Sequence, residues 1–255
     1  MRVAFRIVLI VVLVGIVAGV IVVATSLDGI VKKSVETFGP EITKVSVNLE
    51  SVHIVLFTGS AKVTGLVVSN PEGYKMPQAI SVGLAEVGVN PFSILSDKIV
   101  IRTVHVVSPE INFEGGLGGN NLGKIMENVN AFGKAGGKPS PNVTANQTAK
   151  KIEVDDFLIT GAKVHVRLTD LGGREMTLTL PEIHLTDLGK GTDGLTPADL
   201  TKAVLKAITT ATIKAVSASA TDLGKGAENL GKDAASGAAG DVDKVKKGLG
   251  GLFGK

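Results

Sequence analysis

The residues best suited to chemistry are a glycine-rich run, four histidines and one pair of aspartates. The run Gly118–Ile125 (GGNNLGKI) follows a predicted strand and opens a predicted helix, as a phosphate-binding loop does. Such a loop needs Ser or Thr after its lysine to hold magnesium, whereas Ile125 follows Lys124 here. The sequence also gives no sign of the parallel βαβ unit that carries such a loop. We therefore interpret the run as a turn and a helix cap.

The histidines and the aspartate pair do not form a catalytic set. Asp155-Asp156 has no predicted partner group, and no Gly-x-Ser-x-Gly motif is present. The chain has no cysteine, which excludes disulfides, thiolate nucleophiles and cysteine zinc sites. We expect a non-enzymatic protein with no catalytic residue, no metal site and no cofactor. Each histidine falls alone in a predicted strand, and the four are His53, His105, His165 and His184.

The composition indicates a membrane-associated protein. The 255 residues include 27 basic and 24 acidic ones, so the formal net charge is only +3. Mean hydropathy is +0.32, while aromatic residues make up 4%. A nucleic-acid-binding protein is not expected, because it would show a basic stripe with stacking aromatic residues.

Residues 1–27 are predicted to form a transmembrane anchor. Ile7–Ala24 is an uncharged stretch of 18 residues, which as a helix would span roughly 27 Å, close to the hydrocarbon thickness of a bilayer. Arg2 and Arg6 precede it, so the positive-inside rule keeps the N-terminus cytoplasmic and sends the bulk of the chain across the membrane. The positions assigned to the anchor include Ile7, Leu13 and Val20.

Two further interpretations of this segment remain open. A cleaved signal peptide would use Val22-Val23-Ala24 as its small-residue cleavage site, although signal peptides have shorter apolar cores. In an uncleaved anchor, Gly15 and Gly19 would form a small-residue face on which two anchor helices could pair.

The rest of the chain predicts an α+β fold that is mainly β. Apolar and polar residues alternate from Lys44 onward within 28–133 and from Ile152 onward within 151–220, and short turns join the strands, so we expect a curved antiparallel sheet shared by both regions. The segment 134–150 is predicted to be a linker, because it is rich in Gly, Pro, Ser, Asn and Thr. Two helices, Asn120–Phe132 and Thr196–Ala215, are expected to pack on the sheet. Thr196 is their clearest N-cap, since Pro197 and Asp199 follow it.

The alternation breaks at two places. Near Glu50-Ser51 the apolar positions change parity, which predicts a β-bulge. In Ile99–Val107 the apolar residues fall on both faces of the predicted strand. Either this strand is central and covered on both faces, or one of its faces lines an apolar groove.

After residue 220 the chain becomes rich in Gly, Ala and Lys. We expect 221–255 to be a flexible tail. The alternative is an amphipathic segment that rests on a membrane or on a partner protein.

The arrangement of these segments resembles the N-terminal module of the AsmA-like proteins of bacterial envelopes, with this chain as a short member. The resemblance covers about residues 1–190 and rests on Gly65–Tyr74 (GLVVSNPEGY), Asn90–Ser96 (NPFSILS), Ile99–Glu114 and Asn121-Leu122. It implies a single-pass protein of the bacterial inner membrane with its bulk in the periplasm, and a curved sheet whose apolar groove contributes to lipid transport or outer-membrane biogenesis. Eight to ten strands span only about 40–50 Å, so one copy would not bridge an envelope gap.

Two functions follow from this picture. In the first, acyl chains lie along an apolar face of the sheet, so that the partners are membrane and lipid. In the second, the chain is a structural or assembly scaffold that binds envelope proteins or a second copy of itself through the anchor. The residues expected to line the lipid groove are Val63, Val67, Ile80, Val82, Ile99, Ile101, Val104, Val164 and Val166.

Overall fold

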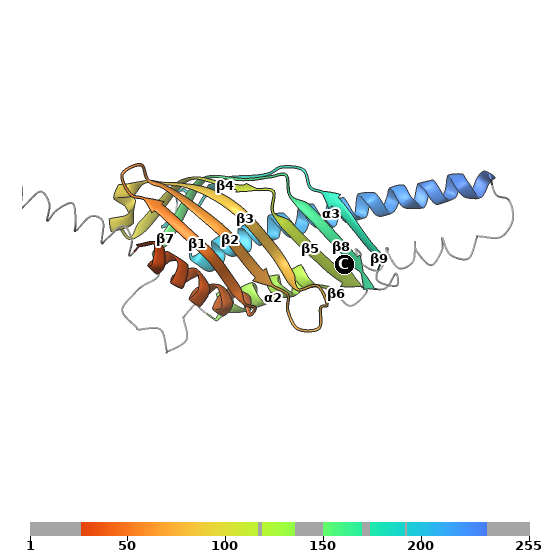
Figure 1. The fold of residues 1–255 in the computed structure, drawn as a ribbon, viewed down its shortest axis with the longest axis horizontal. Helices are drawn as coiled ribbons and strands as arrows, with labels where there is room; N and C mark the ends of the chain where they lie inside the picture. The colour runs from red at the N-terminus through yellow and green to blue at the C-terminus, as the bar shows by residue number, and fades with distance from the viewer. Residues whose placement is uncertain (1–26, 117–118, 136–149, 170–173, 192, 234–255) are drawn as a thin grey trace, which may run out of the picture.

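The computed structural model describes residues 27–116, 119–135, 150–169, 174–191 and 193–233. The described part is mainly β, with one curled sheet, three α-helices and one 3₁₀ helix (Figure 1). The strands are β1 (Val47–Val55), β2 (Ser60–Ser69), β3 (Gln78–Val89), β4 (Lys98–Val107), β5 (Glu110–Gly116), β6 (Gly119–Asn120), β7 (Lys151–Thr160), β8 (Lys163–Leu168), β9 (Arg174–Thr179) and β10 (Ile183–Leu188). The helices are residues 27–43, the 3₁₀ helix η1 (Pro91–Leu95), α2 (Asn121–Lys134) and α3 (Pro197–Asp233).

Nine of the ten described strands form six long ones, and the two-residue β6 pairs only with β5. β4 and β5 continue one another along β3, since Leu84 pairs with Val107 and Ser81 pairs with Glu110 in one unbroken antiparallel register. In the same way β7 continues into β8, and β9 continues into β10 beside them. The sheet therefore runs β1, β2, β3, β4/β5, β7/β8 and β9/β10 from edge to edge.

The sheet is mixed, which corrects the expectation of an antiparallel one. β4 pairs with β7 and β5 with β8 in parallel, and in both ladders the partner numbers differ by 53 (Lys98 with Lys151, Glu110 with Lys163). The reason is the connection: α2 lies between β5 and β7, and a parallel return needs such a long crossover. The prediction that the chain lacks a parallel βαβ unit was therefore wrong.

A crease crosses all six long strands at one level. On its two sides the buried residues of each strand have opposite parity: Val106 and Ile159 are buried before it, and Ile111 and Val164 after it. Ser108 and Gly161 have left-handed backbone there, with φ of 48° and 66°. The crease residues, at matching register positions, are Glu50, Gly65, Gly83, Ser108, Gly161 and Pro181.

The crease replaces the bulge predicted near Glu50-Ser51. The pairing of β1 with β2 keeps one register from Val47 to Val55, without a shift. The change of parity is real, but every strand makes it together, so the ladders on both sides stay in register.

The 27–43 helix was not predicted: residues 28–43 were placed in the first β region, 28–133, without an element of their own. Its start lies at the β1 edge, where the Asp28 carboxylate accepts a 2.9 Å bond from the backbone N–H of Ile54. Glu36 accepts a 3.1 Å bond from the N–H of Leu49 in the same way. The helix thus satisfies free backbone groups of an edge strand that would otherwise recruit another chain.

The two predicted packing helices are present. Asn120 caps α2 by accepting a 2.7 Å bond from the N–H of Gly123, which confirms the helix cap predicted in the glycine-rich run, while Gly119-Asn120 form strand β6. Thr196 caps α3 by accepting a 3.1 Å bond from the N–H of Asp199. α3 does not end near Ala215, however, but continues to Asp233 into the predicted tail, because the chain there still contains many good helix formers.

Some predictions concern residues outside the described ones. The predicted anchor (1–27) lies outside them except for its last residue, as do most of the linker (134–150) and the tail beyond Asp233. Within the described ranges, none of the helices has an apolar stretch sufficient to span a bilayer.

Candidate functional site

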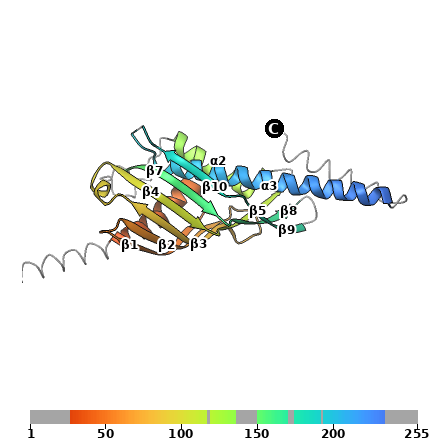
Figure 2. The same ribbon diagram turned by 90° about the horizontal axis from the view of Figure 1, so that it is seen from above.

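The candidate site is the concave face of the sheet, which α3 and α2 face (Figure 2). Directly paired residues on neighbouring strands share a face, so each row of partners can be followed across the sheet. One such row runs from β1 to β10 and is apolar throughout: Val52, Val63, Ala85, Val106, Ile159 and Ile183. The concave face is thus a continuous apolar surface across all six long strands.

Beyond the crease, β5 and β8 carry a part of this face that is completely covered. α2 packs on β5 with Leu122, Ile125 and Val129, which are all buried, and α3 contacts α2 and β9. The strand residues below have at most 4% of their surface exposed. We call them the sealed sector: Ile111, Phe113, Val164, Val166 and Leu168.

On the other side of the crease, β2, β3 and β4 carry a part of the same face that is only half-buried. Its residues pair across these strands, as Val63 does with Ala85 and Val104 with Val87. Closest to the crease, Ala85 and Val106 are buried. We call the half-buried residues the half-exposed sector: Ala61, Val63, Val87, Ile101 and Val104.

The nine predicted groove residues divide between these environments. Val164 and Val166 belong to the sealed sector, and Val82 is also buried. Val63, Ile101 and Val104 belong to the half-exposed sector. Ile80 and Ile99 lie on the concave face beside the two sectors, because they pair with Ile111 and Ile152.

Val67 is the exception, since it lies on the opposite, convex face. It pairs with Ser81 and Asn48, while its neighbours Leu66 and Val68 pack against the core. Val63 and Val67 are four residues apart, so plain alternation predicts one face for both. The crease between them reverses the parity and separates them.

The apolar residues on both sides of β4 have a similar explanation. The register of β4 against β3 shifts by one residue between Thr103 and Ile101, which bulges Arg102 outward. The bulge turns Ile101 onto the same face as Val104. The prediction that the apolar residues of β4 are divided between both faces was therefore wrong, because the main apolar residues of this strand lie together on the concave face.

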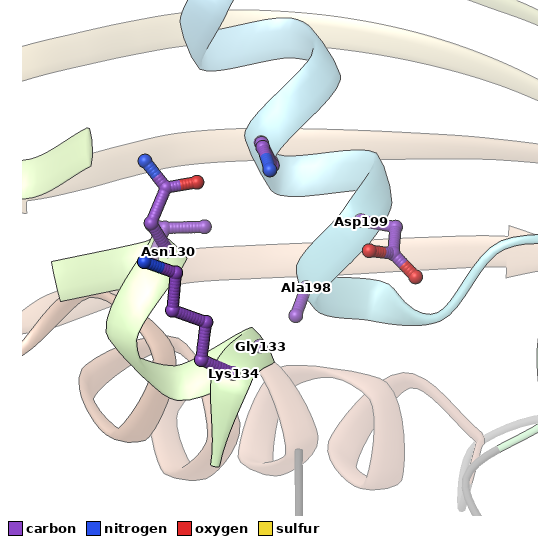
Figure 3. Close-up of a pocket in the computed structure, with 7 residues that line it drawn as sticks. Asn130, Gly133, Lys134, Ala198 and Asp199 are labelled. Atoms are coloured by element: carbon purple, nitrogen blue, oxygen red, sulfur yellow. The ribbon is translucent and has the colours of Figure 1, made fainter. Parts of the chain in front are cut away.

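A small cavity lies where α2 ends and α3 begins, as Figure 3 shows. Its volume is about 200 Å³, and Asn130, Gly133 and Lys134 of α2 face Ala198 and Asp199 of α3 across it. This is less than the roughly 300 Å³ from which small-molecule sites begin. The cavity is thus too small and too polar to hold a lipid chain.

A buried polar cluster lies beside the sealed sector and was missed from the sequence. The carboxylate of Glu114, 1% exposed, accepts backbone N–H bonds from Lys75 at 2.7 Å and Met76 at 2.8 Å. The amide of Asn121 donates to Asn70 Oδ1 at 2.7 Å and to the carbonyl of Asn112. These bonds fasten the β2–β3 loop and the start of α2 to β5. No sequence signal could have found the cluster, because Glu114 alternates with apolar residues as a solvent-facing strand residue does.

Two side chains near these elements have displaced pKa values. Burial, and next the charge of Glu127, raise the pKa of Tyr74 above its usual 10.0. The pKa of Lys190 is also raised, chiefly because the ammonium donates a hydrogen bond to Asp187. Both shifts reflect local packing and pairing.

Three of the histidines share one row on the convex face. His53 pairs with Lys62, Lys62 with Glu86, and Glu86 with His105, while His184 lies two strands beyond His105. His105 Nε2 lies 2.9 Å from Thr160 Oγ1, and His184 Nε2 pairs with the Asp156 carboxylate, a partner that the sequence did not predict. Within the described part of the chain, no three His, Asp or Glu residues are grouped as metal ligands would be.

The chain was compared with known proteins in three ways. No protein-family model, no curated protein and no solved structure matches it.

Proposed function

We propose that the chain is a membrane-anchored module of the bacterial envelope that holds lipid acyl chains on the half-exposed sector. The observation that carries the proposal is the apolar concave face, which crosses all six long strands and, away from the crease on β2, β3 and β4, carries the half-buried residues of the half-exposed sector. A further support is the uncharged Ile7–Ala24 stretch, which would keep this surface close to a bilayer.

The mechanism would be passive. Each methylene that leaves water on this surface would contribute about 0.8 kcal/mol, so a contact of about six methylenes would contribute roughly 5 kcal/mol before ordering costs. The head group would remain in water, because the sector contains only apolar side chains. Such a surface can shield part of an acyl chain without chemistry, which agrees with an inner-membrane, AsmA-like role in lipid transport.

The test uses the full chain in vesicles that contain a phospholipid with a photoreactive group on its acyl chain. Irradiation followed by mass spectrometry should place cross-links on β2 and β4. Val63→Asn, which makes the half-exposed sector polar, should reduce the yield of cross-links. Val67→Asn is the matched control, since it changes the same residue type on the same strand but on the convex face. Equal loss in both variants, or cross-links confined to other strands, would overturn the proposal.

A second candidate function is a scaffold that holds envelope proteins. It is favoured by the sealed sector, where α2 fills the same concave face with its own side chains. If the scaffold is the function, full-length protein should yield no acyl cross-links on β2 or β4 above the level of a detergent-unfolded sample.

A further inference from the structure

Four large apolar side chains are exposed in the described part of the chain. Single exposed apolar residues are normal on a protein surface, but a group of them marks a contact site. Two of the four are aromatic residues at the tips of turns. The four, with the exposed fraction of each residue, are Ile30 (58%), Val55 (40%), Phe57 (88%) and Phe92 (87%).

All four lie at one end of the sheet, which we call the turn end. Phe57 is in the β1–β2 turn, and Phe92 is in η1 between β3 and β4. The two turns touch, because Gly59 accepts a backbone bond from Val89 and a Cβ at Gly59 would lie 2.9 Å from Pro91. Ile30 joins them because the first turn of the 27–43 helix is bonded through Asp28 to Ile54. Both views show this convergence, at the left of Figure 1 and Figure 2.

The position of the turn end along the chain identifies what covers it. The apolar stretch ends at Ala24, and the described chain starts at Leu27 at the turn end. Three residues reach at most about 11 Å, so the end of a spanning segment would lie directly beside these four side chains. We propose that the turn end rests in the interfacial layer of the membrane that the Ile7–Ala24 stretch spans.

Such a contact would orient the molecule. Ala61 and Val87 of the half-exposed sector lie on the strands that lead directly into these turns, so this sector would be next to the bilayer and the sealed sector farther away. The inference rests on the anchoring part of the proposed function. It does not rest on the binding of acyl chains by the concave face.

The test exploits the absence of native cysteine. Three single-cysteine variants of the full chain are made and labelled with a polarity-sensitive fluorophore. They are Phe57→Cys, Phe92→Cys and, as the control, Thr177→Cys. Thr177 is also exposed but lies on β9, at the other end of the sheet (Figure 1). Each protein is reconstituted into phosphatidylcholine–phosphatidylglycerol vesicles with and without nitroxide-labelled lipid.

Labels at 57 and 92 should show a blue-shifted emission and should lose intensity when the nitroxide lipid is present, whereas the label at 177 should do neither. Quenching at 57 and 92 that equals that at 177 would overturn the inference. So would energy transfer between labelled copies without lipid quenching, which would show that a second chain covers the turn end. Flotation of the vesicles separates the two proposals: protein that does not float lacks the anchor itself, whereas protein that floats with unquenched labels is anchored but does not dock.

Discussion

The sealed sector and the half-exposed sector are two parts of one apolar face with different cover. Both consist of apolar strand residues in continuous rows. Ile111 in the first and Ile101 in the second are the same residue type on the same long strand, β4/β5. Yet Ile111 is fully buried, whereas Ile101 is only partly buried. Apolar composition therefore does not decide which part of the face is closed.

The chain connections explain the difference. The sealed sector lies where β5 leads through α2 to β7, so the crossover necessarily places a helix beside these strands. The half-exposed sector is built from strands joined by the β1–β2 turn, the β2–β3 loop and η1, connections too short to lay a helix over the sheet. An acyl chain would therefore supply cover that the fold itself does not provide.

The strongest test of this comparison truncates the same residue type in each sector. Ile111→Ala should lower the free energy of unfolding by about 3–5 kcal/mol, because a closed site cannot refill the space. Ile101→Ala should cost only about 1 kcal/mol, since water and neighbouring side chains can reach it. Urea unfolding of the full chain in detergent, followed by far-UV circular dichroism, measures both values. Equal losses would show that the two sectors are equally closed.

A polar change beside the sealed sector should have the next largest effect. Glu114→Ala leaves the N–H groups of Lys75 and Met76 without their acceptor, which should cost about 2–3 kcal/mol. Glu114→Gln keeps one carbonyl oxygen and should cost about 1 kcal/mol. Glu110→Ala is the matched control on the same strand, because Glu110 is exposed. If Glu114→Ala unfolds at the same urea concentration as this control, the cluster does not stabilise the loop.

The boundary between the sectors can be tested at the crease. Gly161→Ala forces a left-handed backbone on a residue with a side chain and places its Cβ 2.8 Å from Ser108 Oγ, so we expect a loss of about 1–2 kcal/mol. Gly133→Ala, in α2 with open space around it, should instead stabilise the protein by about 0.5–1 kcal/mol. A thermal melt of the full chain compares them. A Gly161→Ala protein that melts at or above the wild-type temperature would contradict the strained geometry of the crease.

The sequence predicted the strands well, because alternation of apolar residues reports local burial. β4, for example, spans Lys98–Val107, within one residue of the strand expected at Ile99–Val107. The sequence could not predict which apolar residues share a face of the sheet. Ile101 and Val104 share one because of a bulge whose position depends on the pairing of β4 with β3. The parity change at Glu50-Ser51 was visible, but a single strand cannot show that five others change with it.

Two segments of similar sequence have different structures for a related reason. Thr58–Val63 and Thr160–Val164 have similar sequences, and both contain a glycine with left-handed backbone, Gly59 and Gly161. The first is the turn between two strands, and the second is the crease within one long strand. The strands that pair with each segment decide whether it forms a turn or a crease, and those strands come from elsewhere in the chain.

The missed 27–43 helix did have a signal in the sequence. Leu27, Val31, Phe38 and Ile42 recur at helical spacing. Gly39-Pro40 was compatible with a break, yet the helix passes through it and ends only where Lys44 takes a left-handed backbone, with a φ of 58°. The role of this helix at the β1 edge, in contrast, depends on contacts such as that of Glu36, which no local pattern reveals.

The smallest expected effect concerns Tyr74, in the loop that Glu114 fastens beside the sealed sector. Burial and the charge of Glu127 raise the pKa of Tyr74, so the folded protein holds this proton at a pH at which the unfolded chain releases it. The resulting stability is fully present below pH 10.0 and is lost as the pH rises through the folded pKa. Tyr74→Phe should remove this part of the alkaline loss. Urea unfolding of both proteins from pH 9 to about pH 11 measures the difference, in which lysine titration cancels because both proteins share it. If the free energies of unfolding of the two proteins change in parallel above pH 10, the loop leaves Tyr74 in a water-like environment and tight packing ends at the sealed sector itself.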